Sequence, residues 1–301
     1  MKRVLITGAS GFIGSNVLKY MLPRTDWEFT AICSWRHKGS PLNVPRDKRV
    51  DVVTHDLRGP IPELGHFDYI LNLASESHVD RSIQQPVTFV ENNIRLMLSV
   101  LEYARRSPPD VLLQFSTDEV FGMPGISASE GVCVPSNPYA ASKACQEMLA
   151  MAYRSTYDVP VVITNSNNVV GPNQDPEKFV PKLIGLIEQN RPVQIHTFGG
   201  ELGKRFYNPV DNVADALLFI LNGFDGHEQC SIPGGVEMDN LEMAILISEI
   251  LEMQLHYELV EVSGIRPGYD TAYQGADNLL FDLGWTPPQT LEEGLAWIAS
   301  P

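Results

Sequence analysis

A tyrosine and a lysine lie four residues apart in the segment Tyr139-Ala-Ala-Ser-Lys143. At this spacing both side chains lie on one face of a helix, so the ammonium can sit beneath the phenol. A nearby positive charge favours the phenolate, and a tyrosine that ionises near neutral pH can take a proton from a sugar hydroxyl. The pair therefore predicts the oxidation of an alcohol by a nicotinamide.

Two adjacent carboxyl groups precede this pair in the segment Ser116-Thr117-Asp118-Glu119. Each negative charge raises the pKa of its neighbour, so adjacent acids in unequal environments can hold opposite protonation states at one pH. An isolated Asp-Glu is more often a solvated strand end or a helix cap. Between Thr117 and a Tyr-Lys pair, we interpret it as an acid and a base that act after the oxidation.

Three glycines, Gly8, Gly11 and Gly14, follow the short apolar run at residues 4–6, with Phe12 and Ile13 between the last two. A glycine-rich turn between a strand and a helix lets the backbone approach a pyrophosphate, whose charge the amides of the helix N-terminus then receive. Three glycines alone are a weak signal, but their place after a first strand predicts dinucleotide binding.

The second strand of such a fold usually ends in an acid that binds the adenosine ribose of NAD. Here the segment reads Ala31-Ile32-Cys33-Ser34-Trp35-Arg36-His37-Lys38 and has no acid. It is either a solvated basic loop or a site in which Arg36, with Ser34 and Lys38, holds the 2′-phosphate of NADP. We therefore expect NAD(P) with a preference for NADP, and Asp56 and Leu57 at the adenine edge.

Apolar runs alternate with helical patterns through the first half of the chain. Strands are expected at residues 29–32, 50–53, 69–73, 111–115 and 159–164, and helices at residues 87–106 and 139–157. Strands that alternate with helices predict an α/β, Rossmann-like, doubly wound parallel sheet. We expect a dinucleotide-binding domain with the catalytic residues at 1–165. The less regular residues 166–301 are expected to form a smaller, partly interleaved substrate-binding lobe.

The composition excludes several classes of partner. The 301 residues carry a formal net charge of −15, and nucleic acid needs a basic surface. No apolar run reaches membrane-spanning length. Four scattered cysteines form no CxxC pair and have no histidine at metal-ligand spacing. We expect a cytoplasmic protein without a metal site, a membrane anchor or a nucleic-acid partner.

Longer motifs make the chain resemble the extended short-chain dehydrogenase/reductase family, and within it the nucleotide-sugar 4,6-dehydratases, particularly the dTDP-glucose 4,6-dehydratases. The resemblance covers nearly the whole chain, and Thr-Asp-Glu is its most discriminating part. The motifs are Thr7-Gly-Ala-Ser-Gly-Phe-Ile-Gly14, Leu73-Ala-Ser-Glu-Ser-His-Val-Asp-Arg-Ser-Ile83, Ser116-Thr-Asp-Glu-Val-Phe-Gly122, Tyr139-Ala-Ala-Ser-Lys143, Gly171-Pro-Asn-Gln-Asp-Pro-Glu-Lys-Phe-Val-Pro181 and Arg266-Pro-Gly-Tyr-Asp270.

The resemblance implies a mechanism for these residues. Tyr139 takes the proton of the sugar 4-hydroxyl while hydride leaves C4, and Thr117 hydrogen-bonds near that hydroxyl. Lys143 lowers the pKa of the tyrosine and binds the nicotinamide ribose. The new ketone acidifies C5–H, which Glu119 removes, and Asp118 protonates the departing 6-hydroxyl. Hydride then returns to C6, giving an NDP-4-keto-6-deoxy-hexose from an NDP-hexose, most simply NDP-glucose.

The resemblance also implies the binding residues. Leu73 and Ala74 are expected beside the dinucleotide. Asn168, Lys178, Arg205 and Arg266 match residues that bind the nucleotide and diphosphate of the substrate, where the planar fork of arginine suits phosphate oxygens. The helices at 87–106 and 139–157 correspond to those that pair two subunits in the family, so a homodimer is expected.

Two other functions remain open at this point. A nucleotide-sugar 4-epimerase or decarboxylase of the same family uses the same cofactor and the same Tyr-Lys pair. A non-catalytic NAD(P)-sensing protein has the fold without the chemistry, but such proteins often lack the tyrosine or the lysine. We therefore favour the dehydratase.

Overall fold

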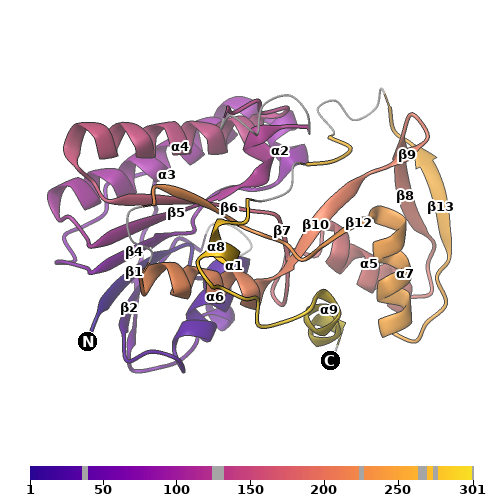
Figure 1. Cartoon of the computed structure of the whole chain (residues 1–301), viewed down its shortest axis with the longest axis horizontal. Coiled ribbons are helices and arrows are strands. Elements are labelled where there is room, and N and C mark those ends of the chain that lie inside the picture. Colours follow the sequence, from indigo (N-terminus) through magenta and orange to yellow (C-terminus); the bar gives the residue numbers. More distant parts are fainter. Residues whose placement is uncertain (36–39, 124–131, 224–226, 264–269, 274–276, 300–301) are drawn as a thin grey trace.

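A parallel sheet of seven strands forms the centre of the part of the chain that the computed structural model describes, residues 1–35, 40–123, 132–223, 227–263, 270–273 and 277–299 (Figure 1). Its strand order is β11-β6-β5-β4-β1-β2-β3. The predicted Rossmann-like, doubly wound α/β fold is confirmed. The strands are β1 (Arg3–Thr7), β2 (Glu28–Cys33), β3 (Val50–Thr54), β4 (Tyr69–Asn72), β5 (Val111–Thr117), β6 (Val161–Ser166) and β11 (Gln229–Ile232).

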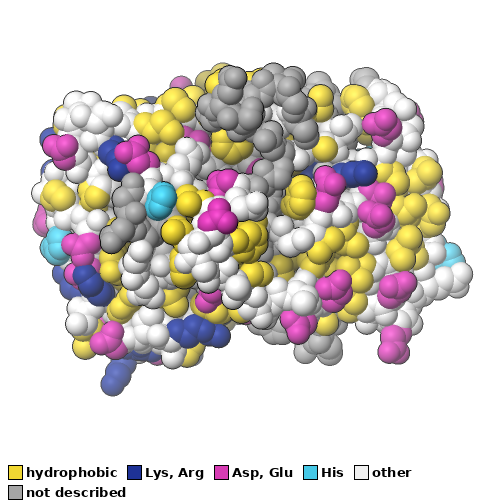
Figure 2. Space-filling view, viewed as in Figure 1, with side chains coloured by type: hydrophobic (Ala, Val, Ile, Leu, Met, Phe, Trp, Pro, Cys, Tyr) yellow, Lys and Arg dark blue, Asp and Glu magenta, His cyan; other side chains and the backbone are white. Residues whose placement is uncertain are grey.

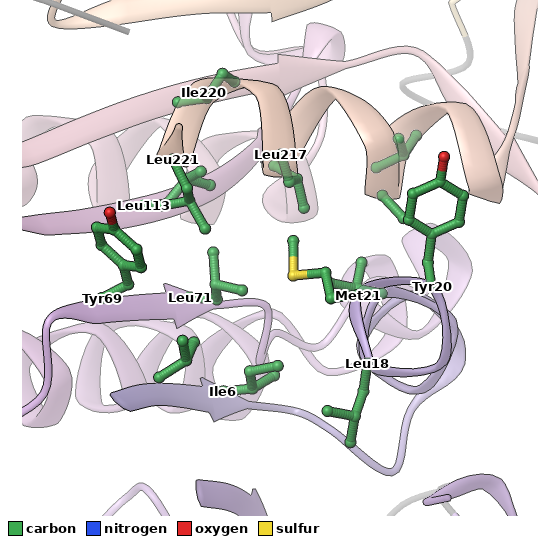
Figure 3. Close-up of a cluster of buried hydrophobic side chains, with 14 of the residues drawn as sticks. Ile6, Leu18, Tyr20, Met21, Tyr69, Leu71, Leu113, Leu217, Ile220 and Leu221 are labelled. Carbon is green, nitrogen blue, oxygen red and sulfur yellow. The ribbon is translucent and has the colours of Figure 1, made fainter. Parts of the chain in front are cut away.

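Helices cover both faces of this sheet (Figure 1). Alternate residues of β1 point to opposite faces, so Val4 and Ile6 enter one core while Leu5 enters the other. Figure 3 shows the first of these cores, in which Met21 of the helix after β1 points toward Leu71 of β4 and Leu217. Helices α1 (Phe12–Met21), α6 (Val210–Leu221) and α8 (Leu279–Asp282) line that face, and α3 (Pro86–Arg106) and α4 (Pro138–Tyr157) line the other.

The start of α4 is fixed by its own sequence. Asn137 is the N-cap, and its side-chain oxygen accepts a hydrogen bond from the amide of Ala140 at 2.9 Å. Pro138 occupies the first helical position, where its missing N–H costs nothing. Tyr139 therefore lies in the first turn of α4, and Lys143 lies one turn later. The backbone amide of Tyr139 donates to the hydroxyl of Ser82 at 3.1 Å, which connects α4 to the short helix α2 (Val79–Gln84).

The second half of the chain builds a smaller lobe with its own core. Two three-stranded sheets, with strand orders β12-β10-β7 and β13-β8-β9, pack with three helices. The strands are β7 (Asn168–Val170), β8 (Val193–Phe198), β9 (Glu201–Leu202), β10 (Lys204–Pro209), β12 (Val236–Asp239) and β13 (Tyr257–Glu261); the helices are α5 (Phe179–Glu188), α7 (Asn240–Ile250) and α9 (Leu291–Ala299). Two short 3₁₀ helices, η1 (Pro41–Asn43) and η2 (Asp118–Phe121), belong to the first lobe.

The two lobes share chain segments. After entering the second lobe at β7, the chain returns to pack α6 against α1 and to add β11 beside β6. Cys230 and Ile232 of β11 are buried in the core of the first lobe. The second half of the chain therefore contributes both to its own lobe and to the central sheet.

Acidic side chains are scattered over both lobes on the face that Figure 2 shows. A dispersed charge of this kind is screened beyond about 8–10 Å at physiological salt, so local Lys and Arg residues decide what binds. None of the helices in the described ranges combines the length and the hydrophobicity that crossing a membrane requires.

Candidate active site

The predicted cofactor residues gather at one edge of the central sheet. The strands are parallel, so their carboxyl ends meet there, and ligands of such sheets bind outside that edge. Each of the first four strands contributes the residues that directly follow it. These are Gly8, Gly11, Phe12, Ile13 and Gly14 after β1, Ser34 after β2, Asp56 and Leu57 after β3, and Leu73 and Ala74 after β4.

The glycine turn after β1 has no room for a side chain at Gly8 or Gly14. A Cβ on Gly14 would lie 2.3 Å from the carbonyl oxygen of Gly8. Gly8 has a φ of +68°, and a Cβ there would lie 2.9 Å from the backbone of Ala74. The turn and the end of β4 are therefore in direct contact, and the start of α1 is left open to a pyrophosphate. This cradle fits a dinucleotide cofactor.

The structure describes three of the four predicted cofactor residues that follow β2 and β3. Ser34 is half-buried, and the indole N–H of Trp35 donates to the hydroxyl of Thr54 at 2.9 Å. Arg36, the residue on which the NADP preference depended, lies outside the described residues. Asp56 forms an ion pair with Arg58 at 2.7 Å, and Leu57 is buried in the core beneath α3.

Lys143 is almost completely buried, with 3% of its surface exposed. Its ammonium donates to the carbonyl oxygen of Phe115 at 2.7 Å and to the side-chain oxygen of Gln146 at 2.8 Å. Burial lowers the pKa of Lys143 to about 8. Of its three N–H groups, one remains for a ligand after these two bonds.

Tyr139 lies beside the acidic pair. Its phenol interacts with the side chain of Thr117, and its pKa is raised by burial and then by the negative charge of Glu119. The expectation of a lowered phenol pKa therefore needs correction. The ammonium of Lys143 is directed to Phe115 and Gln146, and the nearer carboxyl groups act in the opposite direction.

Asp118 and Glu119 follow β5 in the turn of η2, and this turn sends them into different environments. Asp118 is buried, and its carboxyl accepts from the amide of Asn167 at 2.7 Å. Burial raises the pKa of Asp118 to about 7, so this carboxyl keeps its proton below neutral pH and is about half protonated at about pH 7. It has the protonation state of a general acid.

Glu119 is less buried and lines a large cavity. Burial raises its pKa, but the charges of Arg205 and Lys178 oppose that rise. The hydroxyl of Tyr273 also donates to the Glu119 carboxylate at 3.2 Å, which favours the ionised form. The positive groups around Glu119 suit a general base.

The cavity beside Glu119 has a volume of about 1060 Å³ and lies between the two lobes. Three of the predicted substrate residues, Asn168, Lys178 and Arg205, line it, and a cavity of this size accepts a drug-sized ligand. Lys178 donates to the carbonyl of Ser77 at 2.7 Å, which connects the lobes. The fourth predicted residue, Arg266, lies outside the described residues.

Two site residues escaped the sequence analysis. Asn167 holds Asp118 and is itself fixed by the amide of Gly234, which donates to its side-chain oxygen at 2.7 Å. Tyr273 connects Glu119 to Arg205, whose guanidinium lies 4.3 Å from the centre of its ring. The sequence offered one signal for each: Asn167 directly precedes Asn168, and Tyr273 follows the motif that ends at Asp270.

A stability measurement tests the protonation of Asp118. The folded carboxyl keeps its proton up to about pH 7, whereas the unfolded one loses it near its ordinary value of 3.8. Folding therefore takes up a proton in that window, and stability falls as the pH rises through it, by on the order of 4 kcal/mol. Asp118→Asn should flatten this slope in urea unfolding between about pH 5 and about pH 8. Equal slopes in both proteins would show Asp118 ionised at neutrality.

Comparison with known proteins identifies the family. Residues 4–232 match the model of the NAD dependent epimerase/dehydratase family. The chain belongs to this family. A dTDP-glucose 4,6-dehydratase of Haemophilus influenzae is 33% identical over 328 residues, covering 98% of this chain and 96% of the relative. The low-salt glycan biosynthesis protein of Haloferax volcanii is 33% identical over 300 residues, covering 97% and 96%.

Solved structures of the family agree with the fold. DesIV, a dTDP-glucose 4,6-dehydratase of Streptomyces venezuelae with NAD bound, has a TM-score of 0.90 and 29% identity, covering 99% of this chain and 95% of that one. A UDP-glucose 4-epimerase of Thermus thermophilus with NAD has a TM-score of 0.86 and 27% identity, covering 99% and 97%. The resemblance to nucleotide-sugar 4,6-dehydratases is confirmed, and the chain is an enzyme of an NAD-dependent family.

Proposed function

We propose that the protein is a 4,6-dehydratase that converts an NDP-hexose, most simply NDP-glucose, to the NDP-4-keto-6-deoxy-hexose. The observation that carries this proposal is the unequal pair Asp118 and Glu119 beside Tyr139. Elimination of water needs a base and an acid at the same time, and an epimerase needs neither at C5 and C6. Dehydratases among the relatives support the same reading.

The chain's own groups supply the proton transfers. Tyr139 takes the proton of the 4-hydroxyl. Thr117, whose side chain interacts with the Tyr139 phenol, orients that hydroxyl. Glu119 removes the proton from C5, which the 4-ketone has made acidic. Asp118 gives its proton to the 6-hydroxyl, which leaves as water. When bound, the nicotinamide supplies the transient oxidation at C4 and the reduction at C6.

The substrate's nucleotide is proposed to occupy the cavity beside Glu119. Asn168, Lys178 and Arg205 face it, and Arg266 completes the set implied by the family motifs. Lys178 and Arg205 then serve two purposes, because they neutralise the diphosphate and also oppose the rise in the Glu119 pKa that burial causes. Phosphate binding and base strength are thus coupled at this site.

For the cofactor, we propose NAD. The basic residues after β2 suggested NADP, but the solved relatives contain NAD and give that preference no support. The glycine cradle of Gly8 and Gly14 accepts either dinucleotide, since both carry the same pyrophosphate. The mass of the dinucleotide released from the purified protein separates the two, because NADP carries an additional phosphate.

A 4-epimerase is the second candidate, and the fold shared with the Thermus thermophilus epimerase favours it. An NAD(P)-sensing role is weaker, since Tyr139, Lys143 and the acidic pair all lie together.

Turnover in deuterated water separates these candidates. A dehydratase incorporates solvent deuterium at C5 and loses one water, because Glu119 exchanges the proton it has taken from C5 with solvent before C5 is protonated again as hydride returns to C6. We expect this result in mass spectra from a panel of nucleoside-diphosphate hexoses. A product that keeps its 6-oxygen would identify an epimerase, and no turnover with any of them would favour the sensor.

We also propose that the protein is a homodimer in the cytoplasm. Helices α3 and α4 lie side by side on the outside of the sheet (Figure 1). Their exposed faces carry large apolar side chains at Val87, Met148, Met151 and Tyr157, which is typical of a surface that another chain covers. The four cysteines are all free, as is usual in a reducing compartment.

A further inference from the structure

Glu147 is a buried carboxyl that the proposed chemistry does not use. It lies on α4 with 1% of its surface exposed, four residues after Lys143 and therefore on the same helical face. Burying a carboxyl group without a partner of opposite charge is costly. Its place so close to a catalytic lysine calls for a reason.

The hydrogen bonds at Glu147 fit the ionised form. One oxygen accepts from the hydroxyl of Ser116 and from the amide of Asn165, the latter at 2.8 Å. An ionised carboxyl only accepts, and donors aimed at it favour its charged state. The second oxygen is buried and has no hydrogen-bond partner in the described part of the chain. An ionised Glu147 therefore needs a balancing positive charge nearby that is not hydrogen-bonded to this oxygen.

Lys143 is the group that can balance it. Burial raises the pKa of Glu147, and Lys143 acts against that rise, while Glu147 in turn acts against the lowering of the Lys143 pKa. The thiol of Cys133 also faces Glu147, but burial raises the pKa of Cys133 to about 11, so it is neutral. Tyr139, on the same helix, is neutral as well because its pKa is raised.

The residues that donate to Glu147 are also connected to the strand that precedes the acidic pair. Ser116 precedes Thr117 on β5, and Asn165 of β6 donates a second hydrogen bond to the carbonyl of Thr117 at 3.1 Å. The amide of Gln229 on β11 fixes Asn165 by donating to its oxygen at 2.7 Å. Glu147 thus connects α4 to the strand ends that carry Thr117 and Asp118.

We propose that Glu147 is a positioning residue, a buried counter-charge that keeps Lys143 protonated in the active site. The catalytic use of a protonated Lys143 rests on the proposed function, in which the remaining N–H group of this ammonium is available to the cofactor. The charge coupling of Glu147 and Lys143 does not rest on it. The two parts can therefore be tested separately.

Glu147→Gln tests the coupling directly. Gln keeps an oxygen for Ser116 and Asn165 and removes the charge. The pKa of Lys143 should fall by about one unit, because a neighbouring opposite charge contributes roughly that much. From a starting value of about 8, the ammonium fraction at about pH 7.5 would drop roughly threefold. The measurement is an NMR titration of ¹³C-labelled lysine, with Lys143→Arg assigning the signal by its loss.

Glu147→Asp separates charge from packing. It keeps the carboxylate, so the Lys143 pKa should change much less than in Glu147→Gln, even if the shorter side chain lowers stability. Glu102→Gln is the matched control, because Glu102 accepts from Tyr153 of α4 at 2.7 Å, far along the helix from Lys143. It should leave the Lys143 pKa unchanged.

Several results would overturn the proposal. They are an unchanged or raised Lys143 pKa in Glu147→Gln, or equal shifts in the Gln and Asp variants. If Glu147→Gln does not fold, Ser116→Ala replaces it, because loss of this donor destabilises the carboxylate and should also lower the Lys143 pKa. The titration needs no substrate, so its outcome is independent of whether the protein is a dehydratase. In an active dehydratase, the acidic shift should also appear in the pH profile of kcat.

Discussion

Replacing Glu119 by Gln is expected to stop the reaction half-way, with reduced nicotinamide accumulating on the protein. The amide cannot remove the C5 proton, so elimination should slow by roughly 10³-fold, within the usual range for loss of a general base. Oxidation at C4 depends on Tyr139 and should continue. Gln still offers an oxygen to the hydroxyl of Tyr273, which limits the structural change to the lost charge.

The readout for Glu119→Gln is the absorbance of the reduced nicotinamide after mixing with nucleotide sugar, together with the rate of water loss by mass spectrometry. Loss of the negative charge should also lower the pKa of Tyr139, because Glu119 is the charged group that raises it most. Glu249→Gln, an exposed change on α7, serves as the control and should behave like the parent. Normal elimination in Glu119→Gln would assign the base to another residue.

Replacing Tyr139 by Phe is expected to reduce kcat by roughly 10³–10⁴-fold, because the phenol is the group placed to take the proton from the 4-hydroxyl. The pKa of this phenol is raised by burial and by Glu119, so the phenol must release its own proton before it can take that of the 4-hydroxyl. The variant removes only the hydroxyl, and the edge-to-face contact between ring 139 and Phe89 is kept. The binding of the dinucleotide and the KM for the substrate should both be nearly unchanged.

Tyr153→Phe is the matched control for Tyr139→Phe, since Tyr153 lies on the same helix and donates its hydroxyl to Glu102 at 2.7 Å. It should cost no more than about 1 kcal/mol of stability and leave kcat unaltered. Steady-state kinetics and the mass of the bound dinucleotide are measured on both variants. Appreciable turnover by Tyr139→Phe would mean that another group accepts the hydroxyl proton.

Much of the site could be predicted because its residues follow strands. In a parallel sheet every strand ends at the same edge, so a residue just after a strand is placed by its sequence position alone. Gly8, Ala74 and Thr117 come together for this reason. The Tyr-Lys spacing on one helix is equally local, and the N-cap Asn137 fixes where that helix begins.

The charge state of these groups could not be predicted in the same way. A pKa depends on burial and on charges brought close by the fold. Lys143 at its spacing from Tyr139 indicated a lowered phenol pKa, yet the fold directs the ammonium to Phe115 and Gln146. The surroundings of the acidic pair likewise come from distant segments, since Asn167 donates to Asp118 and Tyr273 donates to Glu119.

The sequence by itself determined the sheet, the glycine turn, the helix with Tyr139 and Lys143, and the place of the acidic pair at the end of β5, because each follows from contacts along the chain. Only the tertiary structure decided that β11 completes the sheet, that Tyr273 and Arg205 lie beside Glu119, and that Ser116 and Asn165 donate to Glu147. The physical reason is that burial and electrostatic fields are set by side chains from many segments at once, and no local pattern specifies those neighbours.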